Sequence, residues 1–488
     1  MKDLEARYEV VVIGGGNAGL SAAISAAEHG ARVCLLEKAS QELRGGNTYF
    51  TGDFRFGWES FEDDILPLIP GISAGEINEM KEQVSSYSNE QFYEDVMRVT
   101  EGFTDPDLLR LLVTESLPAI KWLRAMGQEW IPSYHEPGAS MVVKLNGGGA
   151  RLSDQGFKVA AAKGVEIRYQ NVARELLLDS RGKVVGVYAL TPEGFTRIHA
   201  QAVILACGGF EANAGMRASF LGDGWDRVKI RGVPFNTGDG LRMAWDIGAQ
   251  SYGNLNGCHA APQAMDRPAF SVRVQPPLEY RRYGYPWSVM VNAHGQRFID
   301  EGSDKRAYTY AKTGAAIMKQ PHGVAFQICD KKMEPLLKGY YSVTGAKANT
   351  LEQLAQMLGL EPGPFVNTIQ EYNKAVQSGE FNPRILDGKR TIGLAINKSN
   401  WATTIDTPPF VGGGVCCAIT FTYGGLRINT QTEVMNTSEA AIPGLYACGE
   451  IIGGLWYVNY PGGSGMTQGT AFGRIAGRNA AALAKGHG

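Results

Sequence analysis

Short apolar runs alternate with stretches of helical spacing in the first part of the chain. Apolar residues fill 10–13 and 33–36, and an alanine-rich stretch from Asn17 lies between them. Continuous apolar runs of this length predict strands that are buried on both faces. Because strands that alternate with helices favour a parallel sheet, the pattern predicts an α/β domain.

A second pattern interrupts the first. Two runs, 173–178 and 184–189, flank the polar turn 179–183 and predict a β-hairpin. A third strand is expected at 196–200, followed by a separate buried strand from Ala202. Such an antiparallel insertion in a parallel sheet is typical of flavin domains rather than of NAD dehydrogenases.

Helical spacing is strongest in five further stretches. The periodicity predicts helices at 108–126, 350–359, 364–378 and 468–485, and a further helix that follows the glycine turn 146–151 and runs through Ala162. Residues 58–104 are acidic and are expected to form an excursion above the sheet.

Composition divides the chain into three segments. From residue 257 onward prolines interrupt the pattern and arginines accumulate, whereas apolar strand patterns return near the end. A chain of 488 residues exceeds the size of one hydrophobic core, so two domains are expected. We predict a first domain made of 1–256 and 413–488, and a second domain made of 257–412.

Composition also excludes several classes of function. The net charge is −2, which does not favour a nucleic-acid partner. The sequence contains no run of 18 apolar residues, so no membrane span is expected. The seven cysteines form no C-x-x-C pair, so no metal site is expected and a reducing compartment is favoured. The charged start of the chain leaves no room for a signal peptide, and we expect a cytoplasmic protein.

One glycine turn indicates the chemistry. Gly14, Gly16 and Gly19 have the G-x-G-x-x-G spacing of a dinucleotide site, between a predicted strand and a predicted helix. The first glycine allows the turn, the second admits a pyrophosphate, and the third lets the helix pack on the strand. Glu37 ends the next strand, at the interval expected for an acid that binds a ribose hydroxyl.

Several later segments add to this turn. The loop 44–48 (R-G-G-N-T) suits closure over a phosphate or a flavin ring, although a surface turn has the same composition. Four further motifs follow in order along the chain: A-C-G-G-F, T-G-D-G, G-L-Y-A-C-G-E and a final glycine loop at 460–466. Together these motifs resemble the succinate dehydrogenase/fumarate reductase flavoprotein family over nearly the whole chain. Within that family the sequence looks most like the FAD-dependent tricarballylate dehydrogenase branch.

The resemblance implies a fold and a cofactor. It implies a Rossmann-like FAD-binding domain, formed by 1–256 and 413–488, and an α+β capping domain over flavin and substrate. No histidine lies in the loop 44–48, so we predict non-covalent FAD. The glycine spacing and the family positions predict the following FAD contacts: Gly14, Gly16, Asn17, Ala18, Gly19, Glu37, Lys38, Gly45, Gly46, Asn47, Thr48, Gly149, Val172, Gly208, Asp239, Glu450, Ser464, Gly465 and Met466.

The resemblance also implies a reaction. The family moves a hydride between a C–C bond and flavin N5, while a side chain exchanges a proton at the adjacent carbon. Arg306 matches that acid/base position; it is alternatively a carboxylate clamp or a structural ion pair, and Tyr308 and Tyr310 are the other acid/base candidates. Glu279 and Arg282 match a proton relay, for which an ordinary surface pair is the alternative.

The substrate positions match the family only in part. His259 matches a histidine that binds a substrate carboxylate, and Thr422 lies in a substrate-binding stretch. The family's second substrate histidine is replaced by Phe421 and a loop arginine by Tyr460, so two carboxylate contacts are missing.

Three functions therefore stay open. The first is dehydrogenation or reduction of a C–C bond in an anionic carboxylate such as tricarballylate, with an external electron acceptor. The second is a 3-ketosteroid-type dehydrogenase that uses Tyr460. The third is a flavoprotein subunit that feeds an iron–sulfur partner.

Overall fold

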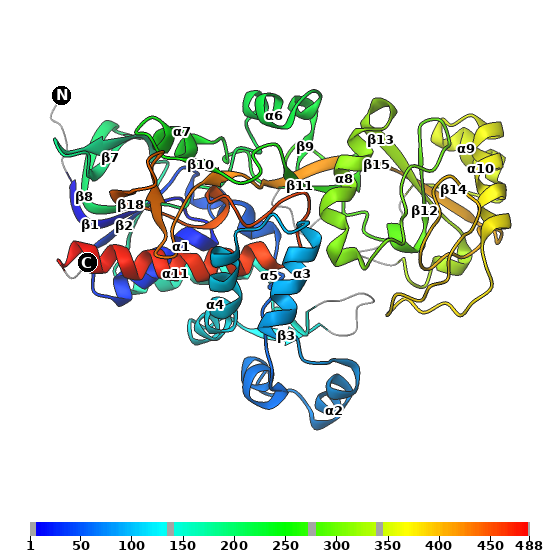
Figure 1. Cartoon of the computed structure of the whole chain (residues 1–488), viewed down its shortest axis with the longest axis horizontal. Helices are drawn as coiled ribbons and strands as arrows, with labels where there is room; N and C mark the ends of the chain where they lie inside the picture. Colours follow the sequence, from blue (N-terminus) through cyan, green and yellow to red (C-terminus); the bar gives the residue numbers. More distant parts are fainter. Residues whose placement is uncertain (1–5, 134–140, 272–279, 338–344, 487–488) are drawn as a thin grey trace.

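The computed structural model describes residues 6–133, 141–271, 280–337 and 345–486. These residues form an elongated molecule with two large sheets, one in each half, and two small two-stranded sheets (Figure 1). The first sheet has eight strands and the second has six.

The eight-stranded sheet is built on parallel strands at its centre. Its order is β17-β18-β8-β1-β2-β5, and β7 joins it by pairing with both β6 and β8. Val10, Val11 and Val12 of β1 are fully buried, as expected for a strand covered on both faces. The strands of this sheet are β1 (Ala6–Ile13), β2 (Val33–Glu37), β5 (Glu166–Tyr169), β6 (Val172–Leu178), β7 (Val184–Thr191), β8 (Gly194–Leu205), β17 (Glu433–Met435) and β18 (Ala441–Ala447).

One expectation for this sheet is wrong. The strands expected at 196–200 and from Ala202 onward are a single strand, β8. Its first half pairs antiparallel with β7, and it pairs parallel with β1 along most of its length. Partners on both sides keep the strand extended through Gln201, so the hairpin and the parallel sheet are continuous.

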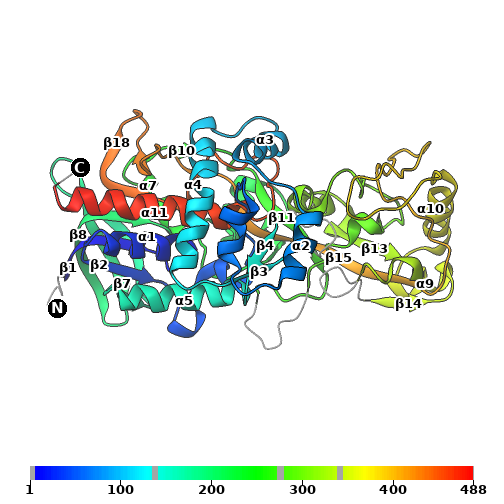
Figure 2. The same ribbon diagram turned by 90° about the horizontal axis from the view of Figure 1, so that it is seen from below.

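Two helices from opposite ends of the chain lie side by side on this sheet. They are α1 (Asn17–Glu28) and α11 (Ser464–Ala484), adjacent in both ribbon views (Figure 1, Figure 2). A Cβ atom on Gly473 would lie 2.5 Å from the carbonyl oxygen of Ala18, and one on Gly477 would overlap that of Ala22. Glycine at both positions is therefore what allows the close approach.

The second sheet belongs to the half predicted as the cap. It contains β9 (Lys229–Ile230), β11 (Cys258–Ala264), β12 (Val289–Asn292), β13 (Val324–Cys329), β14 (Ala346–Ala348) and β15 (Phe410–Thr422). The long strand β15 crosses the predicted boundary between 412 and 413, and β9 joins the sheet from before residue 257. The domain division stays a prediction, and these two strands tie the halves together. The helices α8 (Tyr310–Met318), α9 (Leu351–Leu358) and α10 (Pro362–Ala375) pack around this sheet.

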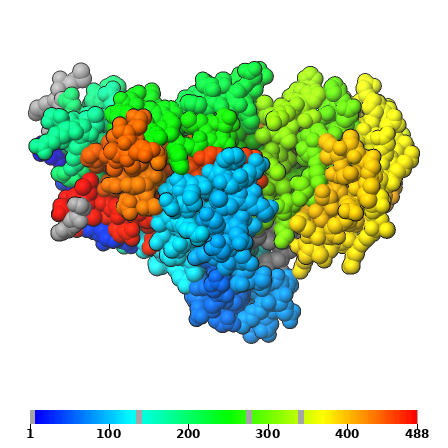
Figure 3. All heavy atoms as spheres, in the orientation of Figure 1, coloured from blue at the N-terminus to red at the C-terminus, as the bar shows by residue number. Residues whose placement is uncertain are grey.

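The acidic segment covers the centre of one face (Figure 3). It holds α2 (Ala74–Gln83) and α3 (Asn89–Val99), which both begin with a serine capping box. The buried Arg55 guanidinium beneath them donates to the hydroxyls of Tyr87 and Tyr308. The remaining elements are α4 (Pro106–Ala125), β3 (Trp130–Pro132), β4 (Val143–Leu145), α5 (Gly148–Ala162), α6 (Ala214–Leu221), α7 (Asp239–Trp245), β10 (Ser251–Tyr252) and β16 (Gly425–Leu426).

Features of a membrane span or a metal site are absent from the described residues. None of the described helices is both long and apolar enough to cross a membrane. No group of three or more His, Cys, Asp or Glu side chains in the described ranges could hold a metal ion. All seven cysteines are free thiols.

Candidate active site

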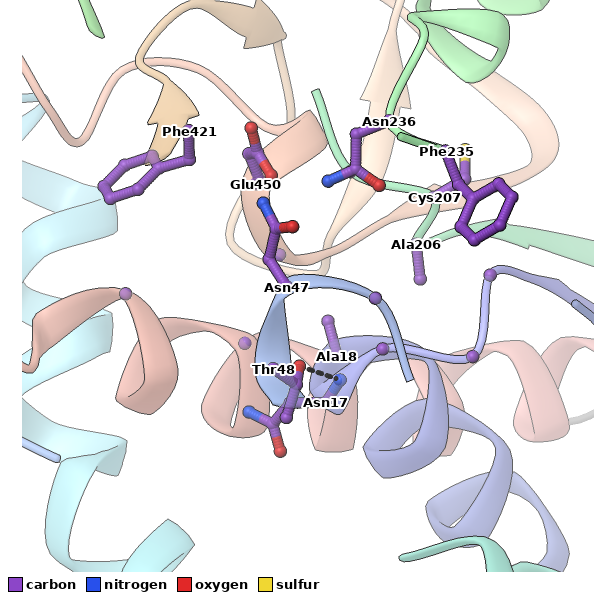
Figure 4. Close-up of a pocket in the computed structure, with 18 of the residues that line it drawn as sticks. Asn17, Ala18, Asn47, Thr48, Ala206, Cys207, Phe235, Asn236, Phe421 and Glu450 are labelled. Atoms are coloured by element: carbon purple, nitrogen blue, oxygen red, sulfur yellow. Dashed lines mark hydrogen bonds between the residues drawn. The ribbon is translucent and has the colours of Figure 1, made fainter. Parts of the chain in front are cut away.

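One cavity runs along the carboxyl ends of the parallel strands and reaches the second sheet (Figure 4). The turns after β1, β2 and β8 line one end, and residues of β11, β15 and α8 line the other. The carboxyl edge of an open parallel sheet is where such folds bind their ligands. We call the first part the dinucleotide end and the second part the substrate end.

The first glycine turn shapes the dinucleotide end. Gly14 has a φ of 106°, and a Cβ atom there would lie 2.5 Å from the carbonyl oxygen of Ala206. A Cβ atom on Gly19 would overlap the carbonyl oxygen of Gly14, so α1 packs directly against the turn. The first N–H groups of α1 therefore face a space that an anion can enter.

The Glu37 carboxylate accepts hydrogen bonds from the backbone at this turn. One carboxylate oxygen accepts from the N–H of Gly15 at 2.9 Å, and the other accepts from Ala39 at 2.8 Å. Carboxylate oxygens have further lone pairs, so Glu37 can still accept from a ribose hydroxyl.

Residues from both ends of the chain meet at Asn17. The Thr48 hydroxyl accepts from the backbone N–H of Asn17 at 2.9 Å, the dashed line in Figure 4. The Asn17 amide donates to the Met466 carbonyl and to the Thr470 hydroxyl, both at 2.9 Å. The loop 44–48 and the start of α11 are thereby fixed to the glycine turn.

Lys38 is held by the T-G-D-G segment. Its ammonium donates to Thr237 at 2.6 Å, to Asp239 at 2.8 Å and to the carbonyl of Phe235 at 3.1 Å. Burial would raise the pKa of Asp239, but the hydrogen bond and the charge of Lys38 outweigh it and lower that pKa. Lys38 and Asp239 form one neutral unit on the cavity wall.

Two adjacent carboxyl groups lie at the middle of the cavity, one half-buried and one fully buried, and the sequence indicated only the half-buried one. Glu450 lines the wall, and Glu211 lies behind it with no exposed surface. One oxygen of Glu211 accepts from the amides of Asn47 and Asn236, at 2.7 Å and 2.6 Å, and the other has no donor among the described residues. Figure 4 shows Asn47, Asn236 and Glu450 directed toward one another.

This carboxyl pair retains a proton. Burial raises the pKa of Glu211, and burial together with the charge of Glu211 raises the pKa of Glu450 well above its usual range. Glu450 accepts from the backbone N–H of Thr422 at 3.0 Å. A proton on Glu450 would give the second oxygen of Glu211 the donor that it lacks.

Aromatic rings form the substrate end. The His259 ring lies 4.7 Å from the Tyr310 ring, 5.1 Å from the Phe421 ring and 5.2 Å from the Tyr460 ring, measured between centroids. Burial, followed by the charge of Arg231, lowers the pKa of His259 well below its usual value. The imidazole is therefore neutral near pH 7.

The two tyrosines at this end keep their protons. Burial raises the pKa of Tyr460 to about 12, and burial raises that of Tyr310 well above its usual value. The Tyr460 hydroxyl accepts from the N–H of Gly465 at 2.8 Å. The hydrogen of the Tyr460 hydroxyl can therefore be donated to a different acceptor.

Arg231 lines the substrate end, although no sequence motif marks it. It follows the short strand β9, and one of its guanidinium nitrogens donates to the Thr420 hydroxyl at 3.3 Å. No described carboxylate lies within ion-pair distance of it. Only the pairing of β9 with β15 brings this part of the chain to the cavity.

The predicted catalytic and substrate-binding residues lie at different depths. His259, Phe421 and Tyr460 line the cavity. Arg306 does not: it is 7% exposed and lies behind the rings of Tyr283 and Tyr310, at 5.4 Å and 5.5 Å from their centroids.

The remaining predicted residues are also away from the cavity surface. Arg282 is buried and donates to the carbonyl of Arg281 at 3.0 Å. Thr422 contacts Glu450 rather than the open space. Glu279 lies outside the described residues.

Most of the predicted FAD residues line the dinucleotide end or the middle of the cavity. Four of them instead pack around it: Gly19, Gly45, Gly149 and Ser464. A Cβ atom on Gly149 would overlap the carbonyl oxygens of Thr48 and Thr51. The lining residues that the sequence did not indicate include Asn171, Phe235, Asn236, Thr420 and Gln468.

Comparisons with known proteins agree with this geometry. The family model described as FAD binding domain matches residues 9–52 and 71–466. A fumarate reductase (cytochrome) of Shewanella frigidimarina is 30% identical, over 98% of this chain and 77% of that protein. A urocanate reductase of Eggerthella lenta is 28% identical, over 98% of this chain and 75% of that protein.

A solved structure shows the same architecture. The open conformation of a flavocytochrome c3 fumarate reductase superposes with a TM-score of 0.74 at 26% identity, covering 98% of this chain and 79% of that one. The expected fold class is therefore confirmed, as are FAD as the cofactor and an oxidoreductase activity on CH–CH groups. The chain belongs to the FAD-binding-domain family and, within it, to the fumarate reductase/succinate dehydrogenase flavoproteins.

Proposed function

We propose that this chain dehydrogenates, or in reverse reduces, a C–C bond next to a carboxylate. The observation that carries the proposal is the single cavity, which joins the glycine turn to the neutral His259, the Tyr460 hydroxyl and the Arg231 cation. Bound FAD supplies the hydride chemistry, and the protein orients the substrate beside it. Relatives named fumarate reductase and urocanate reductase support a carboxylate substrate.

The residues at the substrate end have complementary roles in this proposal. The neutral His259 and the Tyr460 hydroxyl donate to the oxygens of the substrate. Arg231 balances its negative charge, in a site where few waters compete. Because the carboxyl pair Glu211–Glu450 retains one proton, its net charge beside the cofactor is −1 rather than −2, and two adjacent anions are avoided.

One proton accompanies each hydride. In the reducing direction one carbon of the double bond gains a hydride, whose electrons come from an external donor, and the other carbon gains a proton. Arg306 is the predicted acid/base, and its place behind Tyr310 supports a version in which the Tyr310 hydroxyl exchanges the proton. The nearby Arg306 charge would then stabilise the phenolate.

Two finer substrates remain proposals. Tricarballylate is the polycarboxylate that the sequence resemblance suggests. A 3-ketosteroid is the alternative, supported by the Tyr460 hydroxyl next to the apolar Phe421 ring, 5.1 Å between centroids. An external redox dye or protein, or an iron–sulfur partner, would complete the electron path.

The test uses the FAD-loaded protein without oxygen. Reduced enzyme is mixed with carboxylate-bearing alkenes and with a steroid dienone, and oxidised enzyme with their saturated counterparts, while the flavin absorbance is followed. We expect at least one carboxylate pair to exchange electrons. Exchange with the steroid alone, or with none of the compounds, would contradict the proposal.

A matched pair of tyrosines tests the proton step. Tyr310→Phe is expected to slow the exchange about 100-fold while leaving FAD bound, because it removes one positioned acid. Tyr308→Phe is the control, since that hydroxyl donates to Asp95 and does not line the cavity. An unchanged rate in Tyr310→Phe, with loss in Arg306→Lys, would return the role to Arg306.

A further inference from the structure

The charges along the cavity are distributed unevenly. The described lining residues include five acidic or basic side chains: Glu37, Lys38, Arg231, Asp239 and Glu450. Lys38 is paired with Asp239, Glu37 serves the dinucleotide end, and Glu450 belongs to the carboxyl pair. Among the described lining residues, Arg231 is therefore the one charge at the substrate end.

Arg231 lacks a compensating anion within the part of the chain that is described. Its side chain is half-buried and donates a long hydrogen bond, 3.3 Å, to the neutral hydroxyl of Thr420. It lines the same cavity as His259 and Tyr310, and its charge lowers the pKa of His259 and opposes the rise in the pKa of Tyr310. A partly desolvated guanidinium beside an open cavity is suited to bind a ligand anion.

The other cations of this region are committed elsewhere. Arg306 lies against the Tyr283 and Tyr310 rings, outside the cavity wall. Arg297 donates to Glu301 at 2.6 Å. A second substrate carboxylate at this end would therefore face rings rather than a described cation, and burying an unpaired carboxylate is strongly unfavourable.

The walls beside Arg231 are ring faces and edges. Phe421 and Tyr460 meet edge to face at 80°, and Tyr310 meets His259 at 74°. Trp456 supports Tyr460 from behind, with 5.1 Å between ring centroids. Such walls favour a flat conjugated group over a flexible or charged one.

We infer that the substrate carries a single carboxylate, bound by Arg231, and a planar conjugated group that packs among Phe421, Tyr460 and Tyr310. The substrate class is thus a 3-aryl-2-enoate or its saturated counterpart, rather than a di- or tricarboxylate. This inference rests on the proposed function, because it names the substrate of the same site. Binding and turnover are measured separately, so that the two can fail separately.

The experiment titrates oxidised, FAD-loaded protein with four probes and follows the flavin spectrum. The probes are trans-cinnamate, its neutral analogue cinnamamide, fumarate and tricarballylate. We expect trans-cinnamate to bind at least about 10-fold more tightly than cinnamamide, the difference that one charge-assisted hydrogen bond supplies. We expect a similar margin over fumarate and tricarballylate, because their further carboxylates would be buried among rings without a cation. Equal or tighter binding of fumarate or tricarballylate would overturn the inference.

Variants of Arg231 test the anion contact. Arg231→Gln should weaken cinnamate about 10- to 100-fold and leave both cinnamamide affinity and FAD content unchanged. Arg231→Lys should restore most of the binding, and Arg227→Gln, at an exposed arginine four residues earlier, should change nothing. Loss of FAD in Arg231→Gln with unchanged cinnamate affinity would assign Arg231 to the cofactor and overturn the inference.

Turnover separates the two proposals. If cinnamate binds through Arg231 but reduced enzyme transfers no electrons to any carboxylate-bearing alkene, the proposed function fails and the binding inference stands. If fumarate binds more tightly and is reduced, the proposed function stands and the inference fails.

Discussion

The two ends of the cavity are built in different ways. At the dinucleotide end the backbone provides the shape: the turn Gly14–Gly16, the first N–H groups of α1 and the overlap that excludes a side chain from Gly19. At the substrate end, side chains from β11, β15, α8 and the loop before α11 meet around His259. A site made from backbone depends on a short local motif, whereas a site made from side chains depends on how distant segments pack.

Because the two ends are built differently, the substrate end can vary in sequence while the dinucleotide end stays the same. Substitutions at the substrate end can change the ligand without altering the glycine turn. Here Phe421 and Tyr460 occupy positions where the family resemblance predicts a histidine and an arginine, while the motifs at the dinucleotide end match. The same fold can therefore carry one hydride chemistry on different substrates.

The largest effect is expected where the backbone leaves no room. Gly19→Val would drive its side chain into the Gly14 carbonyl, so we expect FAD to be lost and the free energy of unfolding to fall by about 3 kcal/mol or more. The measurement is the flavin-to-protein absorbance ratio of the purified variant, together with its Tm.

A matched glycine controls for the change of residue type. Gly363→Val lies in the first turn of α10, where an added Cβ atom meets nothing within 4 Å. It should retain FAD. A Gly19→Val protein with a full complement of FAD would show that the turn tolerates a side chain, and the contrast between the two ends would collapse.

A smaller effect is expected at the carboxyl pair, where the two ends meet. Because the pKa values of Glu211 and Glu450 are raised, the folded protein holds a proton that the unfolded chain releases above about pH 4.3. Stability is then lost as pH rises, by about 1.4 kcal/mol per pH unit for each retained proton, until the folded pKa is reached. Glu211→Gln removes one carboxylate, and its amide can donate to Glu450.

We therefore expect Glu211→Gln to be more stable than the parent protein, by a margin that widens with pH. Thermal unfolding of FAD-loaded protein between about pH 5 and about pH 8 measures the margin. Glu352→Gln, at an exposed glutamate of α9, is the control and should show no such trend. A margin that does not change with pH would mean that the pair holds no proton in the folded protein over this range.

The smallest effect is expected from a single hydrogen bond in the glycine turn. Thr48→Val leaves the buried N–H of Asn17 without its acceptor, at a cost of about 1 kcal/mol. Thr48→Ser retains the hydroxyl and should behave like the parent protein. Tm values of the two variants decide this: a Thr48→Val protein as stable as the parent would show that the hydrogen bond contributes nothing.

The sequence predicted the dinucleotide end in detail because its signals are local. Glycine spacing, the strand before it and the helix after it all lie between residues 6 and 28, and each of these elements is present in the structure. Helices were also predictable from periodicity, with ends shifted by a few residues: α11 begins at Ser464 rather than at 468. The merging of two expected strands into β8 was not predictable, because it depends on partners that β7 and β1 supply.

The sequence by itself determined the α/β class, the glycine turn of the dinucleotide end and the family, because each depends on short motifs whose structure does not require distant segments. Only the tertiary structure brought Glu211 against Glu450 and Arg231 beside His259, across separations in the chain that no spacing rule spans. It also placed Arg306 behind Tyr310 rather than on the cavity surface. Burial and proximity set the charge of these groups, and both are properties of the packed chain rather than of any segment alone.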